Sequence, residues 1–131
     1  MRRFKTLMIG VLLLVPCWAL AGEVEILTAH FSRQSNNAWN VNVTLRHDDS
    51  GWDHYADAWR VIDAQDGVLG TRTLFHPHVN EQPFTRSHSM NIPAAVVTVF
   101  IEAHDKVHGW SGQRLKIDLS QAQDGQLKVN R

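Results

Sequence analysis

A strict alternation of apolar and polar residues is the feature that most constrains the fold of this chain. In residues 39–45, WNVNVTL, the two classes exchange at every step, which places the apolar side chains on one face of an extended strand. Residues 115–119, LKIDL, repeat the pattern. Helical periodicity does not appear between them. The sequence therefore predicts an all-β protein.

Five further segments are predicted to be strands, because most of them are rich in β-branched and aromatic residues. They are residues 24–33, 55–63, 68–75, 84–92 and 96–104. Turn-forming residues separate them, among them Asp66-Gly67 and Pro93. Strands of this length and spacing predict a seven-stranded antiparallel sandwich of the immunoglobulin type. Trp59 is expected to lie in its core.

The first 21 residues have the pattern of a secretory signal peptide. Basic residues precede an apolar run at residues 7–15, and Ala19-Leu20-Ala21 offers a small-residue cleavage site. We predict cleavage after Ala21, which leaves residues 22–131 as one domain in the periplasm or secreted. The apolar run is too short to span a bilayer comfortably, so we expect no membrane anchor after cleavage, although an uncleaved anchor is the alternative.

Cys17 raises the question of lipid attachment. Pro16 stands where a lipoprotein cleavage site requires a small residue, so the sequence favours ordinary cleavage. Cys17 is the only cysteine, and the mature domain would therefore contain no disulfide. Stability must then come from an apolar core, for which this length is sufficient.

The charge of the mature chain excludes one class of partner. Cleavage of the signal peptide removes three of the thirteen basic residues and no acidic residue. The mature chain then has ten basic and thirteen acidic residues, a net charge of −3. Phosphate binding needs clustered Lys and Arg, so nucleic acid is not expected to be a partner.

Eight histidines follow the leader, many for so small a domain. Six of them lie at strand ends or in connections, in three groups: His47 and His54, His76 and His78, His104 and His108. Because successive antiparallel strands return every second connection to the same end, all three groups are expected to share one end of the sandwich. The other two, His30 and His88, lie within predicted strands and are interpreted as ordinary polar residues.

Imidazole is the commonest protein ligand for copper, zinc, iron and nickel, so these six histidines are the predicted metal-site residues. Asp53 and Asp105 are candidate carboxylate ligands, or acceptors for a ligand's second ring nitrogen, and Asp48 and Asp49 are placed to do the same. Ligation by histidine without cysteine suits Cu(II) best and zinc next. No compact motif such as His-Glu-x-x-His is present in the sequence.

Three strings carry a resemblance: GWDHYADAWRV, HPHVNEQPFTR and EAHDKVHGWSG. Together they resemble an uncharacterised family of small exported bacterial proteins. More loosely, His54 with Trp59, and His108 with Gly109 and Trp110, resemble the desulfoferrodoxin type of superoxide reductase, an immunoglobulin-like iron protein. His104 or Asp105 stands where that family has a cysteine ligand. Superoxide reduction is therefore not implied here.

The leading hypothesis is a periplasmic protein that captures, buffers or delivers copper or zinc, with an exported protein as its potential partner; redox catalysis stays open. The alternative is an interaction module that binds a protein or small ligand through Trp52, Trp110, Phe84 and the histidines. A hydrolase is the weakest interpretation, because Ser111 lacks the nucleophile-elbow pattern. An enzyme is thus less expected than a binding protein.

Overall fold

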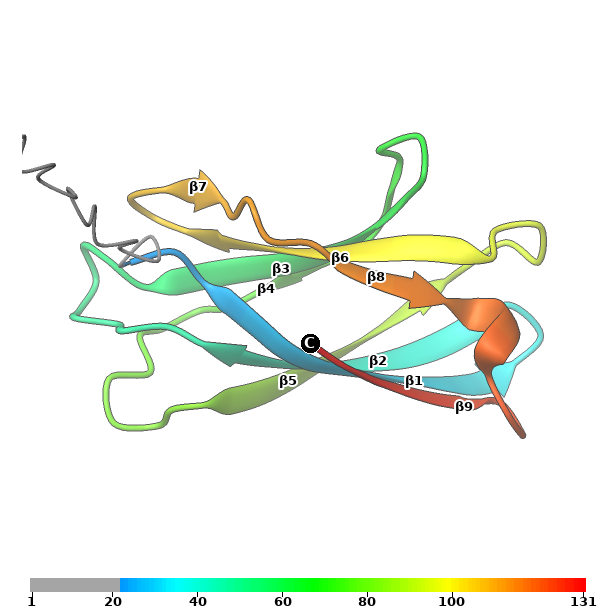
Figure 1. Ribbon diagram of the computed structural model, residues 1–131. Coiled ribbons are helices and arrows are strands. Elements are labelled where there is room, and N and C mark those ends of the chain that lie inside the picture. Colours follow the sequence, from blue (N-terminus) through cyan, green and yellow to red (C-terminus); the bar gives the residue numbers. More distant parts are fainter. Residues whose placement is uncertain (1–21) are drawn as a thin grey trace, which may run out of the picture.

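The computed structural model describes residues 22–131; the predicted signal peptide and Cys17 lie outside the described residues. Two antiparallel β-sheets pack face to face (Figure 1). The strands are β1 (Glu25–Ser35), β2 (Ala38–Arg46), β3 (Ala56–Asp63), β4 (Val68–Thr73), β5 (Phe84–Asn91), β6 (Thr98–Asp105), β7 (Gly109–Trp110), β8 (Leu115–Asp118) and β9 (Gln126–Asn130). A short 3-10 helix, η1 (Leu119–Gln121), follows β8.

The strand order is β5-β2-β1-β9 in one sheet and β4-β3-β6-β7 in the other, where β8 also pairs with β6. The all-β, two-sheet prediction is confirmed, and each of the seven predicted segments contains a strand. The predicted number of strands is wrong, because residues 22–131 form nine. The two additional ones are β7, which is only two residues long, and β9, which pairs with β1 at the sheet edge.

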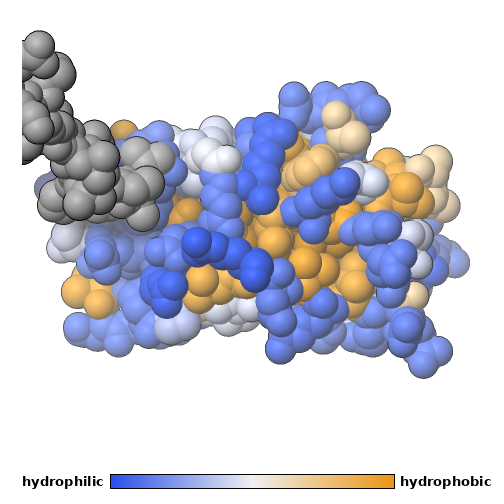
Figure 2. Space-filling model, in the orientation of Figure 1, coloured by the Kyte–Doolittle hydropathy of each residue, from blue (hydrophilic) through white to orange (hydrophobic). Residues whose placement is uncertain are grey.

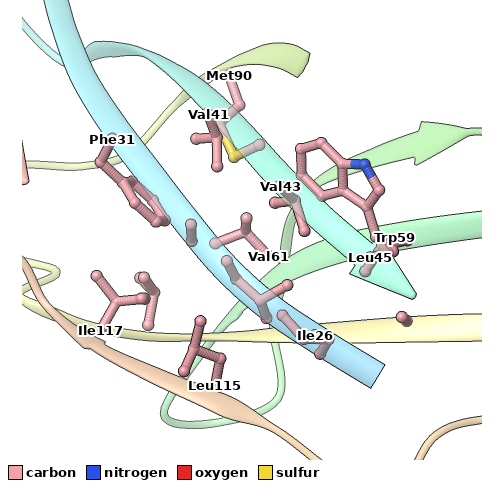
Figure 3. Close-up of a cluster of buried hydrophobic side chains, with 14 of the residues drawn as sticks. Ile26, Phe31, Val41, Val43, Leu45, Trp59, Val61, Met90, Leu115 and Ile117 are labelled. Atoms are coloured by element: carbon pink, nitrogen blue, oxygen red, sulfur yellow. The ribbon is translucent and has the colours of Figure 1, made fainter. Parts of the chain in front are cut away.

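The core lies between the sheets and follows from the alternation in the sequence. Trp39, Val41, Val43 and Leu45 of β2 are all buried. Val41, Val43 and Leu45 lie in the cluster of apolar side chains shown in Figure 3. Trp59 of β3 is fully buried among them, as expected. Burial of such side chains stabilises the fold by roughly 1.5–3 kcal/mol each, which explains how the domain holds together without a disulfide.

The two sheets approach closely where β4 meets β5. A β-carbon at Gly70 of β4 would lie 2.9 Å from Cε of Met90 and 3.0 Å from its Cβ. We expect Gly70→Ala to lower the free energy of unfolding by about 1–3 kcal/mol, because overpacking forces this contact apart. Urea denaturation measures the effect. Gly112→Ala, where an added β-carbon meets nothing within 4 Å, is the control and should change stability by less than about 0.5 kcal/mol.

The connections β2–β3, β4–β5 and β6–β7 lie at the same end of the sandwich, where the described chain also begins (Figure 1). We call this the loop end. The extra strands do not disturb the expected arrangement, because β7 lies inside the sixth predicted connection and β9 follows the seventh predicted strand.

The face in Figure 2 shows apolar residues across its middle, with hydrophilic residues on either side. Partly buried side chains of β9, Leu127 and Val129, pack against the core. Within residues 22–131, no helix has the length and apolar character needed to cross a membrane.

Candidate metal centre

Three potential ligands converge at the loop end. His47 directly follows β2, His54 lies in the β2–β3 connection, and Asp105 is the last residue of β6. Their ligand atoms all lie within 4.8 Å of one another. We call these three residues the His47–His54–Asp105 group; it could bind a metal ion.

The distances in this group are close to those of a metal site. His54 Nε2 lies 3.2 Å from Oδ1 of Asp105, and His47 Nε2 lies 3.9 Å from Oδ2 of the same carboxylate. With bonds of about 2.0–2.2 Å, the ligand atoms of a tetrahedral site lie roughly 3.4 Å apart. A contraction of at most about 1.4 Å would therefore bring all three atoms onto one ion.

Asp105 is the anionic member and is held in place by the turn that follows it. Its Oδ1 accepts hydrogen bonds from the backbone amides of Val107 and His108, each at 2.8 Å. Burial opposes ionisation of this carboxyl group, but these two amides and the His108 imidazole outweigh it, so its pKa is lowered. The buried side chain is thus a carboxylate aimed at the two imidazoles.

His47 is fixed on both sides of its ring. Its Nδ1 lies 2.5 Å from Oδ1 of Asp49, and its Nε2 lies 2.6 Å from the carbonyl oxygen of Gly22. The carboxylate behind Nδ1 orients the ring, as carboxylates behind metal-binding histidines do. A metal ion bound at Nε2 would take the place of the proton that this nitrogen donates to the Gly22 carbonyl oxygen.

Asp49 organises the site from behind. Besides facing His47, its buried carboxylate accepts hydrogen bonds from the backbone amides of Ala56, at 2.9 Å, and His78, at 2.7 Å. It therefore ties the β2–β3 connection to β3 and to the β4–β5 connection. Gln82 adds a second tie, because its side chain accepts from the His47 amide and donates to the His78 carbonyl.

His54 presents a buried nitrogen without a partner. Its Nε2 has no hydrogen-bond partner within the described chain, although the Asp105 carboxylate lies close by. A buried polar atom left unpaired costs on the order of 1–3 kcal/mol. This atom is the strongest indication that the His47–His54–Asp105 group receives a ligand.

His108 lies beside the group and is more exposed. Its ring is 5.1 Å from that of His54, and its Nδ1 faces Asp105 at 3.1 Å. With Nδ1 directed at the carboxylate, Nε2 is the nitrogen available to a metal. His108 is therefore a neighbour of the group, with one ring nitrogen free to bind a metal.

The β4–β5 histidines have other surroundings. The ring of His78 stacks on Phe84 with centroids 4.0 Å apart, and its Nε2 lies 2.9 Å from the guanidinium of Arg86. Burial lowers the pKa of His78, and the positive charge of Arg86 lowers it further. His76 is exposed, with its ring 4.6 Å from that of His78. Neither belongs to the His47–His54–Asp105 group.

His104 and Asp53 also lie outside this group. His104 belongs to β6, where its Nδ1 faces Asp57 at 2.5 Å and its ring packs against Trp110. Asp53 is exposed in the β2–β3 connection. Of the predicted site residues, the structure thus brings together His47, His54 and Asp105, with His108 against them.

Two contributors were not expected from the sequence. Nothing in the sequence indicates that the side-chain amide of Gln82 links two connections. Gly22 enters through its backbone carbonyl, which no side-chain pattern reveals. Its conformation, with φ of 113°, is one that favours glycine.

Comparison with known proteins yields one relative of note. The chain is 36% identical over 96 residues to a protein of Halomicrobium mukohataei named "Putative lipoprotein". The match covers 73% of this chain and 47% of that protein, so the chain spans about half the length of its relative. No protein-family model and no solved structure matches the chain.

Proposed function

We propose that this protein is an exported metal-binding protein that holds copper, or failing that zinc, at the loop end and serves in capture, buffering or delivery. The observation that carries the proposal is the buried, unpartnered Nε2 of His54 beside the Asp105 carboxylate. His47 supplies the second imidazole, already oriented by Asp49.

The ligand types favour late first-row metals. Imidazole suits copper, zinc, iron and nickel, whereas sites for calcium and magnesium are built from oxygen ligands. The affinity order for divalent ions places copper highest, and the chain after the leader has no cysteine to draw the preference toward zinc or iron–sulfur clusters. Copper is therefore the first choice and zinc the second.

Export is supported from two sides. The sequence begins with the pattern of a signal peptide, and the relative from Halomicrobium mukohataei carries the name of a lipoprotein. We place the protein in the periplasm or outside the cell, with residues 22–131 as the mature domain. There the metal would meet a folded site, because His47 and Asp105 are far apart in the unfolded chain.

Calorimetric titration of the mature domain with Cu(II) and Zn(II) tests the proposal. We expect one ion per chain, bound more tightly for copper, and at least about 100-fold weaker binding in the variant His54→Ala with Asp105→Asn. His30→Gln is the matched control, because His30 is a solvent-accessible histidine that contacts Gln126 on β9, at the sheet edge. Equal affinity in both variants, or no binding by the unaltered domain, would refute the proposal.

An interaction module is the second candidate, favoured by exposed apolar side chains at the same end. Trp52 and Phe75 are 65% and 73% exposed, and Val79 and Val107 are exposed in the same set of connections. Phe84 does not belong to this surface, because it is buried beneath His78. A module of this kind would retain its partner after chelation of metal, which distinguishes the two candidates.

A further inference from the structure

Gly22 lies directly against the histidines of the proposed metal site. A β-carbon on this residue would lie 2.6 Å from Cε1 of His108 and 3.4 Å from Cε1 of His54. Its carbonyl oxygen lies 2.6 Å from Nε2 of His47. The carbonyl oxygen of Gly22 therefore contacts His47, and its α-carbon faces the rings of His54 and His108.

The same contacts place the backbone nitrogen of Gly22 at the site. This nitrogen is bonded to the α-carbon that carries the hypothetical β-carbon, so it lies within about 5 Å of the His108 ring. A side chain here would collide with His108 unless that ring moved, and the φ of 113° also favours glycine. In the precursor the nitrogen is an amide, a poor metal ligand.

We propose that the α-amino group created by cleavage after Ala21 is itself a ligand of the metal, alongside His47, His54 and Asp105. The inference rests on the proposed function. The amine and the carbonyl oxygen of Gly22 can bind one ion together and close a five-membered chelate ring. Processing of the precursor would then complete the site.

The Gly22 α-amino group would account for the proposed preference for copper. An amine with two imidazoles gives three nitrogen donors, and a tetragonal arrangement of nitrogen and oxygen ligands is typical of Cu(II). The Asp105 carboxylate supplies the oxygen and offsets part of the ion's charge. A pocket beside the group, lined by Gly22, His47, Arg46 and Gln113 among others, leaves the Gly22 side of the site open to solvent.

The test compares three forms of the domain: one beginning at Gly22 with a free amine, one acetylated on that amine, and one with an alanine added before Gly22. Because Gly22 occupies its place in the full precursor chain, both modified forms should fold, which thermal unfolding without metal checks. We expect Cu(II) affinity to fall at least about 100-fold in both modified forms. Electron paramagnetic resonance of the copper complex should show the loss of one nitrogen donor.

The outcomes separate the two proposals. Equal Cu(II) affinity and equal spectra in all three forms would overturn the amine ligand and leave the metal site itself standing. Absence of binding in the free-amine form would overturn both. Intact-mass measurement of the protein exported from cells must also show Gly22 as the first residue; another start would overturn the inference whatever the affinities.

Discussion

Replacing Asp49 with alanine is expected to lower the free energy of unfolding by about 3–5 kcal/mol. The carboxylate is buried and accepts from three groups: the His47 ring and the amides of Ala56 and His78. Alanine would leave all three without a partner in the interior, where each unpaired donor costs on the order of 1–3 kcal/mol. Denaturant unfolding followed by tryptophan fluorescence measures the loss.

The neighbouring residue provides the control for this change. Asp48 is exposed, and Asp48→Ala should alter stability by less than about 0.5 kcal/mol. Asp49→Asn keeps an acceptor and should fall between the two. If Asp49→Ala were as stable as Asp48→Ala, Asp49 would not be the residue that ties the loop end together.

Saturation with Cu(II) is expected to stabilise the domain by about 4 kcal/mol when the free ion is at 1,000 times its dissociation constant. The His47–His54–Asp105 group exists only in the folded state, so binding and folding are linked. His54→Ala should remove most of this gain. Thermal unfolding with controlled free copper gives the measurement.

His54→Ala separates the metal from the fold. Because Nε2 of His54 has no hydrogen-bond partner in the described chain, its removal breaks no hydrogen bond and should not lower metal-free stability by more than about 1 kcal/mol. His30→Gln should keep the full gain from copper. A variant that lost stability equally with and without copper would indicate that His54 has only a structural role.

The strands that could be predicted from the sequence are those with a clear apolar pattern. The strands of the core, such as β2 and β6, carry enough β-branched and aromatic residues to be recognised. The edge strand β9 was missed because it buries little: Leu127 and Val129 are only partly covered and alternate with polar residues. Its position depends on pairing with β1, which is a tertiary contact.

The site could be predicted only to the level of which loops meet. The alternating direction of successive strands correctly predicted that the three histidine-bearing connections lie at one end. It does not predict which imidazole ring points inward. His78 and His104 are turned to other partners, Arg86 and Asp57, and no side-chain pattern in the sequence reveals these contacts. Asp49 was expected as an acceptor for a ligand's second ring nitrogen and does face His47, whereas Gly22 became visible only through its contacts, because it acts through its backbone.

The members of the His47–His54–Asp105 group come from different layers. His47 leaves β2 in one sheet, whereas Asp105 ends β6 in the other. An ion bound by both would join the layers at the loop end, so the sheets could not separate there before the ion departs. Bound copper should therefore slow unfolding more than it speeds folding, and the rate of unfolding should be limited by release of the ion.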